Sequence, residues 1–301
     1  MNRELRISLI VCTFNREVIL PVVLKSFTTI TADKSIFEII IVNNNSTDST
    51  EQICRDFILN NPDLQIQYHL ETQKGLSAAR NRGIKESKSE LICFLDDDAE
   101  VTTDYVDRAI EFFDSHPGID AMGGKILPVY ATGEEPKWMS KPLWGLVTKA
   151  DWGDKTREYP YSKYPPGASM IFRKSLFKEI GVFNTELHLR SDDKYIFRQM
   201  ESKGKKFLYY PKLVAYHHID EFRCTFESVK KISLVVGASE KIRLQDAGII
   251  KNAFKVFEYI LKLGAAIILA MIFLVKLEYQ KAEYIIKNRW LTLYGYFNTK
   301  L

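Results

Sequence analysis

Three consecutive aspartates, Asp96, Asp97 and Asp98, directly follow an apolar run at residues 91–95. Such a run is typical of a buried parallel strand, and ligands bind where these strands end. Three adjacent carboxylates repel one another unless a cation lies between them. Carboxylate oxygens suit Mg²⁺ or Mn²⁺, which often bridge protein groups to phosphates. The triplet therefore predicts a Mg²⁺ or Mn²⁺ site. The alternative is a solvated acidic turn that caps the next helix.

Two further apolar runs, at residues 7–12 and 39–42, are also followed by polar side chains: Thr13, Asn15, Arg16, Asn43 and Asn45. The carboxyl ends of parallel strands converge on one edge of a sheet, so these side chains should be neighbours of the aspartates. After a single strand they would pass for ordinary turn residues. Their recurrence after three strands favours a polar pocket beside the metal, with Asp96 and Asp97 as part of it.

The pocket lacks the usual glycine-rich phosphate loops. No Gly-x-Gly-x-x-Gly follows the first strand and no Gly-x-x-x-x-Gly-Lys occurs, which disfavours a nicotinamide dehydrogenase and a P-loop NTPase. Basic side chains would then hold a diphosphate together with the metal. Arg80 and Arg82 lie two apart on a predicted helix at 76–86, so only one of them can face the pocket. We expect Arg80 to do so because it is nearer the strand ends; a solvated helix face is the alternative.

A second acidic pair, Asp192 and Asp193, opens a predicted helix at 193–203. One carboxylate there would stabilise the helix dipole as a cap, and the other would be free to act as a base. His217 and His218 follow a predicted strand at 214–216. Imidazole is a common metal ligand, although a pair of surface histidines fits the same pattern.

Apolar runs and helical patterns alternate along the first hundred residues, which predicts a doubly wound α/β sheet. The predicted strands there are 7–12, 39–42, 66–69 and 91–95, and the predicted helices are 16–29, 49–59 and 76–86. The pattern continues with a helix at 103–115, strands at 119–124, 169–172, 206–210 and 214–216, and a helix at 174–180. Residues 128–166 lack periodicity but contain three tryptophans, which favours an ordered functional loop over disorder.

The chain has 301 residues, of which 46% are hydrophobic and 12% aromatic, which is typical of a globular protein. Its four cysteines lie far apart, without metal-site spacing, and indicate reduced thiols. The first residues lack the pattern of a secretory signal. We therefore expect a cytoplasmic protein.

Residues 226–301 are predicted to be helical, and the end of the chain is basic. From Lys230 onward there are twelve Lys and Arg against five Asp and Glu, and residues 263–275 carry no charge. Thirteen residues are too few to span a bilayer. A basic helical segment with an apolar stretch instead favours peripheral binding to an anionic membrane, on the inner face of the plasma membrane. A hairpin packed on the protein itself is the alternative. Nothing here resembles a nucleic-acid groove.

Several motifs together resemble the family 2 glycosyltransferases in order and spacing. The donor half carries SLIVCTFNR at 8–16, NNNSTD at 43–48, the segment 75–83 and FLDDD at 94–98. The acceptor half carries GASMIFR at 167–173, EIGVF at 179–183 and the pair Asp192-Asp193. Each motif alone is weak, but the combination is specific and extends over residues 5–220.

The resemblance implies a GT-A fold, with a mainly parallel sheet and flanking helices. It also implies inverting transfer of a hexosyl or related sugar from a nucleotide diphosphate sugar, UDP-linked, to an acceptor hydroxyl in surface polysaccharide or glycolipid synthesis. By position, Thr13 and Asn43 would contact the base and Asp96 the ribose.

For the reaction itself, the resemblance implies that Asp98 carries the metal, with His217 as a further ligand. Asp193 matches the catalytic base, and Asp192 stands where the family has glutamate. A metal that offsets charge on the leaving diphosphate and a base that removes the acceptor proton agree with this chemistry.

Three positions depart from the family pattern. Asn43 stands where aspartate is usual, so a neutral amide replaces the acceptor for the uracil imide proton. Ser191-Asp192-Asp193 replaces Gly-Glu-Asp, and Ser169 replaces asparagine in the Gly-Ala-Asn motif. The donor base, the donor sugar and the acceptor therefore stay open.

We expect a glycosyltransferase domain at 1–225, with a nucleotide-sugar half at 1–125 and an acceptor half at 126–225, and a helical extension at 226–301. Two other functions fit metal carboxylates beside a nucleotide pocket. A sugar-phosphate nucleotidyltransferase should have a glycine-rich loop after its first strand, and 12–16 has no glycine. A catalytically silent sugar-nucleotide-binding partner subunit need not retain Asp98 and Asp193.

Overall fold

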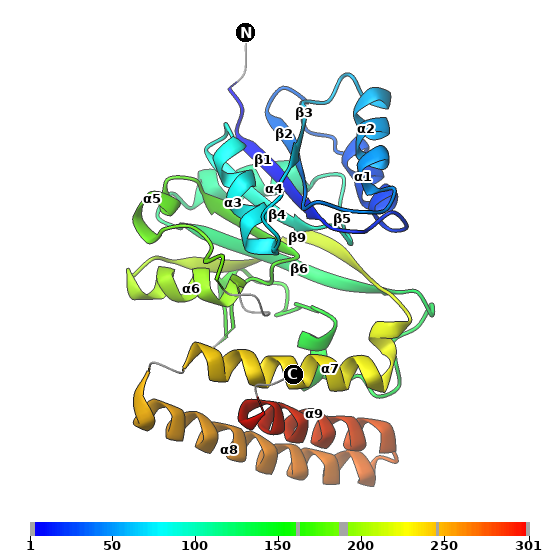
Figure 1. Ribbon diagram of the computed structural model, residues 1–301, viewed down its shortest axis with the longest axis vertical. Coiled ribbons are helices and arrows are strands. Elements are labelled where there is room, and N and C mark those ends of the chain that lie inside the picture. Colours follow the sequence, from blue (N-terminus) through cyan, green and yellow to red (C-terminus); the bar gives the residue numbers. More distant parts are fainter. Residues whose placement is uncertain (1–3, 161–162, 187–191, 245–246, 299–301) are drawn as a thin grey trace. The chain divides into compact units, whose positions relative to one another are not determined.

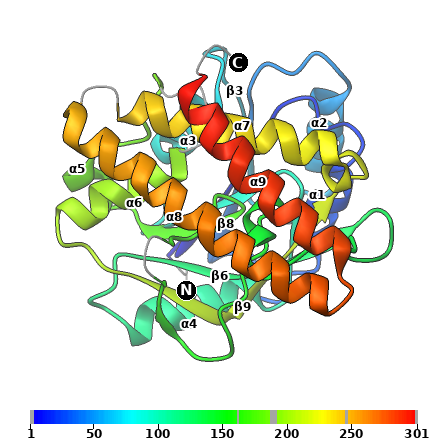
Figure 2. The same ribbon diagram turned by 90° about the horizontal axis from the view of Figure 1, so that it is seen from below.

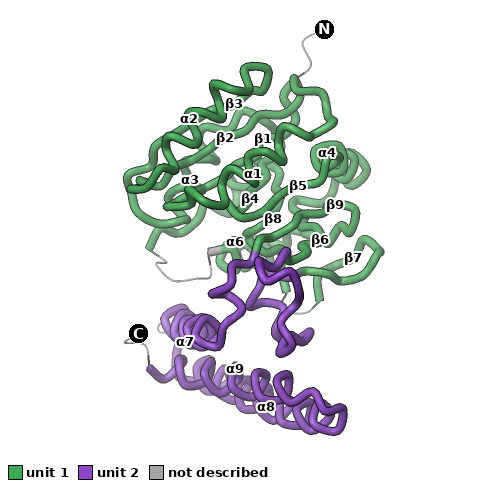
Figure 3. The backbone as a smooth tube through the Cα atoms, turned by 90° about the vertical axis from the view of Figure 1, so that its right-hand side faces the viewer, with its two compact units in different colours: residues 1–128, 150–188, 192–218 green, residues 129–149, 189–191, 219–301 purple. Residues whose placement is uncertain are grey.

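The computed structural model describes residues 4–160, 163–186, 192–244 and 247–298. The chain forms two compact units (Figure 3). Unit 1 comprises residues 1–128, 150–188 and 192–218, and unit 2 comprises 129–149, 189–191 and 219–301. Unit 2 thus takes in residues 129–149, which the sequence placed with the acceptor half. The domain boundary at 225 stays a prediction.

Unit 1 is built on one mixed sheet (Figure 1). Its strands within the described residues are β1 (Ile7–Thr13), β2 (Phe37–Asn43), β3 (Ile66–Leu70), β4 (Leu91–Asp96), β5 (Ala99–Val101), β6 (Ala121–Tyr130), β7 (Arg157–Glu158), β8 (Ser169–Arg173) and β9 (Phe207–Ile219). The order is β3-β2-β1-β4-β8-β6-β9-β5, with β7 paired to β9. Strands β3, β2, β1 and β4 run parallel, as predicted. The pairs β4–β8, β6–β8, β5–β9 and β7–β9 are antiparallel.

The parallel strands are apolar because helices cover both faces of the sheet. One face packs on α1 (Leu20–Thr28), α2 (Thr50–Asn60) and α4 (Tyr105–Ser115). The other packs on α3 (Leu76–Glu86), α5 (Leu176–Ile180) and α6 (Asp192–Ser202). The register pairs Thr13 with Asn43 and Cys12 with Asp96. The three strands therefore end level, and the polar residues that follow them share one edge.

Helix α1 and strands β9 and β5 differ from what the sequence predicts. Helix α1 begins at Leu20 rather than at residue 16, with Pro21 in its first turn, where the missing N–H costs nothing. Strand β9 is continuous through Pro211, where the sequence predicts two separate strands. Strand β5 is missed by the sequence analysis because it has only three residues. None of the four cysteines, all of which lie in the described residues, forms a disulfide bond, as predicted.

Unit 2 contains α7 (Phe226–Arg243), α8 (Gly248–Val275), α9 (Tyr279–Phe297) and the short 3₁₀ helices η1 (Lys141–Leu146) and η2 (Phe222–Cys224). Helices α8 and α9 lie side by side (Figure 2). Helices α7 and α9 approach so closely that a Cβ atom on Gly237 would lie 2.1 Å from the carbonyl oxygen of Thr292. One on Gly295 would lie 2.3 Å from that of Leu234. Glycine is therefore required at this crossing.

Helix α8 extends well beyond the charge-free stretch 263–275, which the sequence analysis judged too short to span a bilayer. It runs unbroken for 28 residues, about twice the charge-free stretch. The mean hydropathy of its most apolar 18-residue window is 2.1, and among the described residues it is the one helix long and apolar enough to cross a membrane. Only 17% of its most apolar window is buried. Length alone therefore does not exclude a membrane span.

Candidate active site

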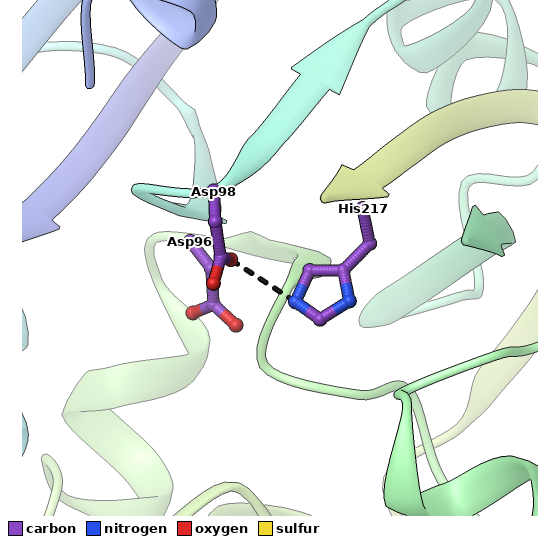
Figure 4. Close-up of side chains that lie close together, drawn as sticks. All are labelled: Asp96, Asp98 and His217. Atoms are coloured by element: carbon purple, nitrogen blue, oxygen red, sulfur yellow. Dashed lines mark ion pairs between the residues drawn. The ribbon is translucent and has the colours of Figure 1, made fainter. Parts of the chain in front are cut away.

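The carboxylates of Asp96 and Asp98 and the imidazole of His217 face one another at the edge of the sheet (Figure 4). Each side chain offers one ligand atom, and these atoms all lie within 4.8 Å of one another. Asp98 and His217 are buried, and Asp98 Oδ1 lies 3.0 Å from His217 Nε2. Two carboxylates and one imidazole fit a divalent cation. The two predicted metal ligands are thus neighbours, and Asp96 joins them.

Strand β5 is what places His217 opposite Asp98. Ala99 pairs with His217, and the backbone N–H of His218 donates to the carbonyl of Asp98 at 2.8 Å. Side chains alternate along a strand, so the two histidines point to opposite faces. His218 pairs instead with Glu100, a partner that sequence reasoning missed. The only signal for it was the alternating Ala-Glu-Val of this short strand.

Arg16 supplies positive charge to the aspartate triplet. Its Nε lies 3.0 Å from Asp97 Oδ1 and its Nη2 lies 3.4 Å from Asp98 Oδ2. Burial raises the pKa of Asp97 to about 6, although Arg16 acts to lower it. Burial also acts to lower the pKa of Arg16, but Asp97 and Asp98 raise it above its ordinary value. Part of the charge repulsion predicted for the triplet is therefore offset by this arginine.

Asn15 and Asn45 shape the loops beside the triplet. Both have left-handed backbones, with φ of 51° and 61°, a conformation that asparagine tolerates better than most residues. The backbone N–H of Asn15 donates to Ser46 Oγ at 3.0 Å, and its side-chain oxygen accepts from the N–H of Thr47 at 2.8 Å. These bonds join the loop after β1 to the loop after β2, so Asn15 holds the two loops together.

Thr13 and Asn43 are buried at the ends of β1 and β2. The Asn43 side-chain oxygen accepts from the N–H of Ser46 at 2.9 Å, and its amide nitrogen donates to Tyr68 Oη at 3.0 Å. A backbone N–H can only donate, which fixes the orientation of the amide. Both ends of Asn43 therefore have partners within the protein. Its contact with the base stays a prediction, one that requires these bonds to rearrange or be shared.

The structure separates the two candidate arginines. Arg80 is 3% exposed, and its Nη2 lies 3.4 Å from Asp96 Oδ1. Arg82 Nε instead lies 2.8 Å from Glu86 one turn along α3. Arg80 therefore lies beside the triplet, as the sequence analysis expects, but in a buried position.

The candidate base lies at the start of α6. Asp193 is half-buried in the first turn, and its Oδ1 accepts from the N–H of Lys194 at 2.7 Å. The side chain of Asp192 lies outside the part of the chain that the structure describes. The catalytic roles of both residues stay predictions.

Residues 8–181 match the family model for glycosyl transferase family 2. Glucosyl-dolichyl phosphate glucuronosyltransferase of Haloferax volcanii is 20% identical over 248 residues, which are 79% of this chain and 77% of that protein.

Two solved structures resemble this one over nearly its whole length. Mannosyltransferase PcManGT from Pyrobaculum calidifontis, in complex with GDP-Man and Mn2+, has a TM-score of 0.63 and 18% identity, over 97% of this chain and 88% of that one. TarS of S. aureus in complex with UDP has a TM-score of 0.57 and 17% identity, over 99% and 92%. At these identities the likeness concerns the fold, and the predicted GT-A class is confirmed. The family model matches more than half of the sequence, and this chain belongs to the family 2 glycosyltransferases.

Proposed function

We propose that this glycosyltransferase is metal-dependent and inverting, and that it moves a sugar from a UDP-linked donor to an acceptor hydroxyl in surface polysaccharide or glycolipid synthesis. The observation that carries the proposal is the group formed by Asp96, Asp98 and His217, whose ligand atoms lie within 4.8 Å of one another. Asp96 and Asp98 stand at the carboxyl ends of the parallel strands, the place where ligands bind in open α/β sheets.

Two names among the similar proteins support the substrate classes. TarS is solved with UDP, and the Haloferax relative is named for glucosyl-dolichyl phosphate, a lipid-linked sugar. PcManGT is solved with GDP-Man, so the similar structures do not share one nucleobase. Asn43 is the residue proposed to contact the nucleobase. Its side-chain amide already makes hydrogen bonds to Ser46 and Tyr68.

In this proposal, metal binding, nucleotide binding and proton transfer fall to different residues. Asp98 and His217, with Asp96, would hold the cation, while Thr13 and Asn43 line the nucleotide side of the pocket. A bound Mn²⁺ or Mg²⁺ supplies positive charge for the leaving diphosphate. Asp193 accepts the proton of the acceptor hydroxyl as that oxygen attacks the sugar from the side opposite the diphosphate. Attack from that side inverts the configuration of the sugar.

A panel of nucleotide sugars tests this function. We expect Mn²⁺-dependent release of UDP from one or a few UDP-sugars, and faster release when a lipid-linked saccharide is added. Binding of the nucleotide sugar without turnover would instead favour a silent partner subunit. Formation of a nucleotide sugar from a sugar phosphate and a nucleoside triphosphate would favour a nucleotidyltransferase.

We further propose that α8 and α9 bind an anionic membrane surface from the cytoplasmic side. The exposed apolar side chains of α8 extend along its whole length and comprise Ile249, Ile250, Phe254, Phe257, Ile260, Leu261, Ile267, Ile268, Met271, Ile272, Leu274 and Val275. The side chains that pack inward are different ones, including Tyr259, Ala266 and Ala270. An apolar face this continuous indicates a partner.

The positions of the charges favour a helix that lies in the membrane plane. Lys251, Lys255, Glu258 and Lys262 recur at helical spacing, so they share one flank of α8 beside the apolar face. Helix α9 packs along α8 and carries Lys281, Glu283, Lys287 and Arg289. A spanning α8 would draw these charges into the hydrocarbon, which costs several kcal/mol.

Helix α9 adds side chains suited to the headgroup region. Tyr279, Trp290, Tyr294 and Phe297 are exposed, and tryptophan and tyrosine are enriched at membrane interfaces. Placement on the membrane would keep the active site near a lipid-linked acceptor.

Vesicle flotation tests the membrane proposal. We expect the full-length protein to float with anionic liposomes at low salt, and the variants Ile268→Glu and Phe257→Glu to float less. Gln280→Glu adds the same charge at an exposed polar position and is the matched control. Equal flotation of all variants would exclude this face, and no flotation of the parent protein would favour an intramolecular or oligomeric hairpin.

A further inference from the structure

Arg80 is a buried arginine of unit 1 that lies beside Asp96, one of the three candidate metal ligands. The guanidinium carbon of Arg80 lies 5.8 Å from the ring centroid of Phe94 and 5.3 Å from that of Phe183. The side chain is 3% exposed, and its Nη2 lies 3.4 Å from Asp96 Oδ1. Removing a guanidinium from water is costly unless a charge or an aromatic face compensates it. The two rings and Asp96 provide that compensation.

The aromatic cage is itself held in place by the next residue of α3. The side-chain nitrogen of Asn81 donates to the carbonyl of Phe183 at 2.8 Å, and the N–H of Phe183 donates to the side-chain oxygen of Asn81 at 2.9 Å. This reciprocal pair fixes the Phe183 backbone beside α3. The backbone that carries the ring over the guanidinium is therefore tied to α3.

Gly167 provides the room that the guanidinium occupies. A Cβ atom at Gly167 would lie 2.5 Å from Arg80 Nη2 and 3.4 Å from its guanidinium carbon. The neighbouring carbonyl of Ala168 accepts from the N–H of Asp96 at 3.4 Å. The segment that enters β8 thus contacts both the backbone of Asp96 and the arginine that pairs with its side chain. Any side chain at residue 167 would displace this arginine.

Direct contact between Arg80 and a diphosphate fits this geometry poorly, because only 3% of the side chain is exposed. Orientation of the Asp96 carboxylate requires no movement. Ligating carboxylates commonly depend on such hydrogen-bonded partners.

We propose that Arg80 is a positioning residue, which holds the Asp96 carboxylate toward Asp98 and His217, and that Gly167 keeps the space for it. The proposal rests on the proposed metal site. Arg80 would act through geometry: its Nη2 lies 3.4 Å from Asp96 Oδ1, and the planar guanidinium fork, caged between two rings, sets the direction from which the carboxylate is held.

Titration of the full-length protein with Mn²⁺ alone, followed by electron paramagnetic resonance, tests this without nucleotide or turnover. Arg80→Lys keeps the charge but loses the fork, and Gly167→Ala displaces the fork without changing any charge. We expect each to weaken Mn²⁺ binding about tenfold. Arg82→Lys, two residues along the same helix, should bind like the parent. In an Asp96→Asn background, Gly167→Ala should have no further effect.

The outcomes separate the two levels of the proposal. Parent-like Mn²⁺ binding by both Arg80→Lys and Gly167→Ala would overturn the positioning role while the metal site stands. Failure of the parent protein to bind Mn²⁺ would overturn the metal site and this role with it. Thermal unfolding identifies a variant that does not fold, and Arg80→Lys still decides the question if Gly167→Ala is that variant.

Discussion

The active-site edge of unit 1 and the outer face of α8 and α9 in unit 2 depart from ordinary protein surfaces in opposite ways. At the edge, charged groups are buried: Asp97, Asp98 and Arg80 are each less than a tenth exposed. On the helices, large apolar groups are exposed, with Ile249 and Val275 at 89% and 85%. Buried charge and exposed apolar surface both cost free energy in a protein standing alone. The comparison supports the two proposals made above, a cation and donor at the edge of unit 1 and a lipid surface on α8 and α9.

The strongest test of the proposed reaction in unit 1 is Asp193→Asn. We expect transfer to the acceptor to fall by about 10²- to 10⁴-fold, because the amide cannot take the acceptor proton. Binding of the nucleotide sugar should be unchanged, since the base acts on the acceptor. Steady-state rates and calorimetric donor binding measure the two effects. Asp192→Asn is the matched control; if it were inactive and Asp193→Asn active, the two roles would be reversed.

Asp98→Asn tests the metal at the same edge. The amide keeps the shape of the side chain but loses its charge, so we expect Mn²⁺ binding to weaken and metal-dependent transfer to fall on the order of 10²-fold or more. Circular dichroism should show an unchanged fold. Full turnover with Mn²⁺ in this variant would be incompatible with Asp98 as a ligand.

Gly237→Val tests whether unit 2 is a packed body or a loose extension. The new side chain would enter the backbone of α9 near Thr292, so we expect a loss of about 3 kcal/mol in the free energy of unfolding. The variant should still bind the nucleotide sugar at temperatures at which it is folded. Gly264→Ala, where nothing lies within 4 Å of the new Cβ, should be neutral or stabilising by up to about 1 kcal/mol. Equal effects of the two changes would contradict the close α7–α9 crossing.

Local patterns predicted the elements of unit 1 well. Apolar runs located β1 to β4, and the pattern at 76–86 located α3 to the residue. Each of these elements is long enough for its periodicity to be read. Helix α8 shows the limit of this approach: composition identified its apolar stretch, but only the packing of α9 shows which of its faces is covered.

The sequence predicted which residues belong to the candidate site better than it predicted their contacts with one another. Strand ends converge by a general rule, which brought Asp96, Asp98 and Thr13 together. The position of His217 depends on the pairing of a three-residue strand, and that of Arg80 depends on the absence of a side chain at Gly167. Such contacts join residues far apart in the sequence, and no local pattern encodes them.

The smallest effect that we predict concerns the pH dependence of the metal-free protein. Burial raises the pKa of Asp97 to about 6, above the value of about 4 for an aspartate in an unfolded chain. Between these two pH values the folded protein holds a proton that the unfolded chain has lost, so the stabilising contribution of Asp97 is complete below pH 4 and is lost as the pH rises through 6. Asp97→Asn removes the titrating carboxyl group and with it this pH-dependent contribution to stability. In urea unfolding with EDTA from pH 4 to 7, we expect the parent protein to lose stability relative to the variant by about 1 kcal/mol per pH unit, most steeply between pH 4 and 6. Parallel stability curves would mean that Arg16 already keeps Asp97 ionised at low pH, and the charge at this edge would then be balanced without a cation.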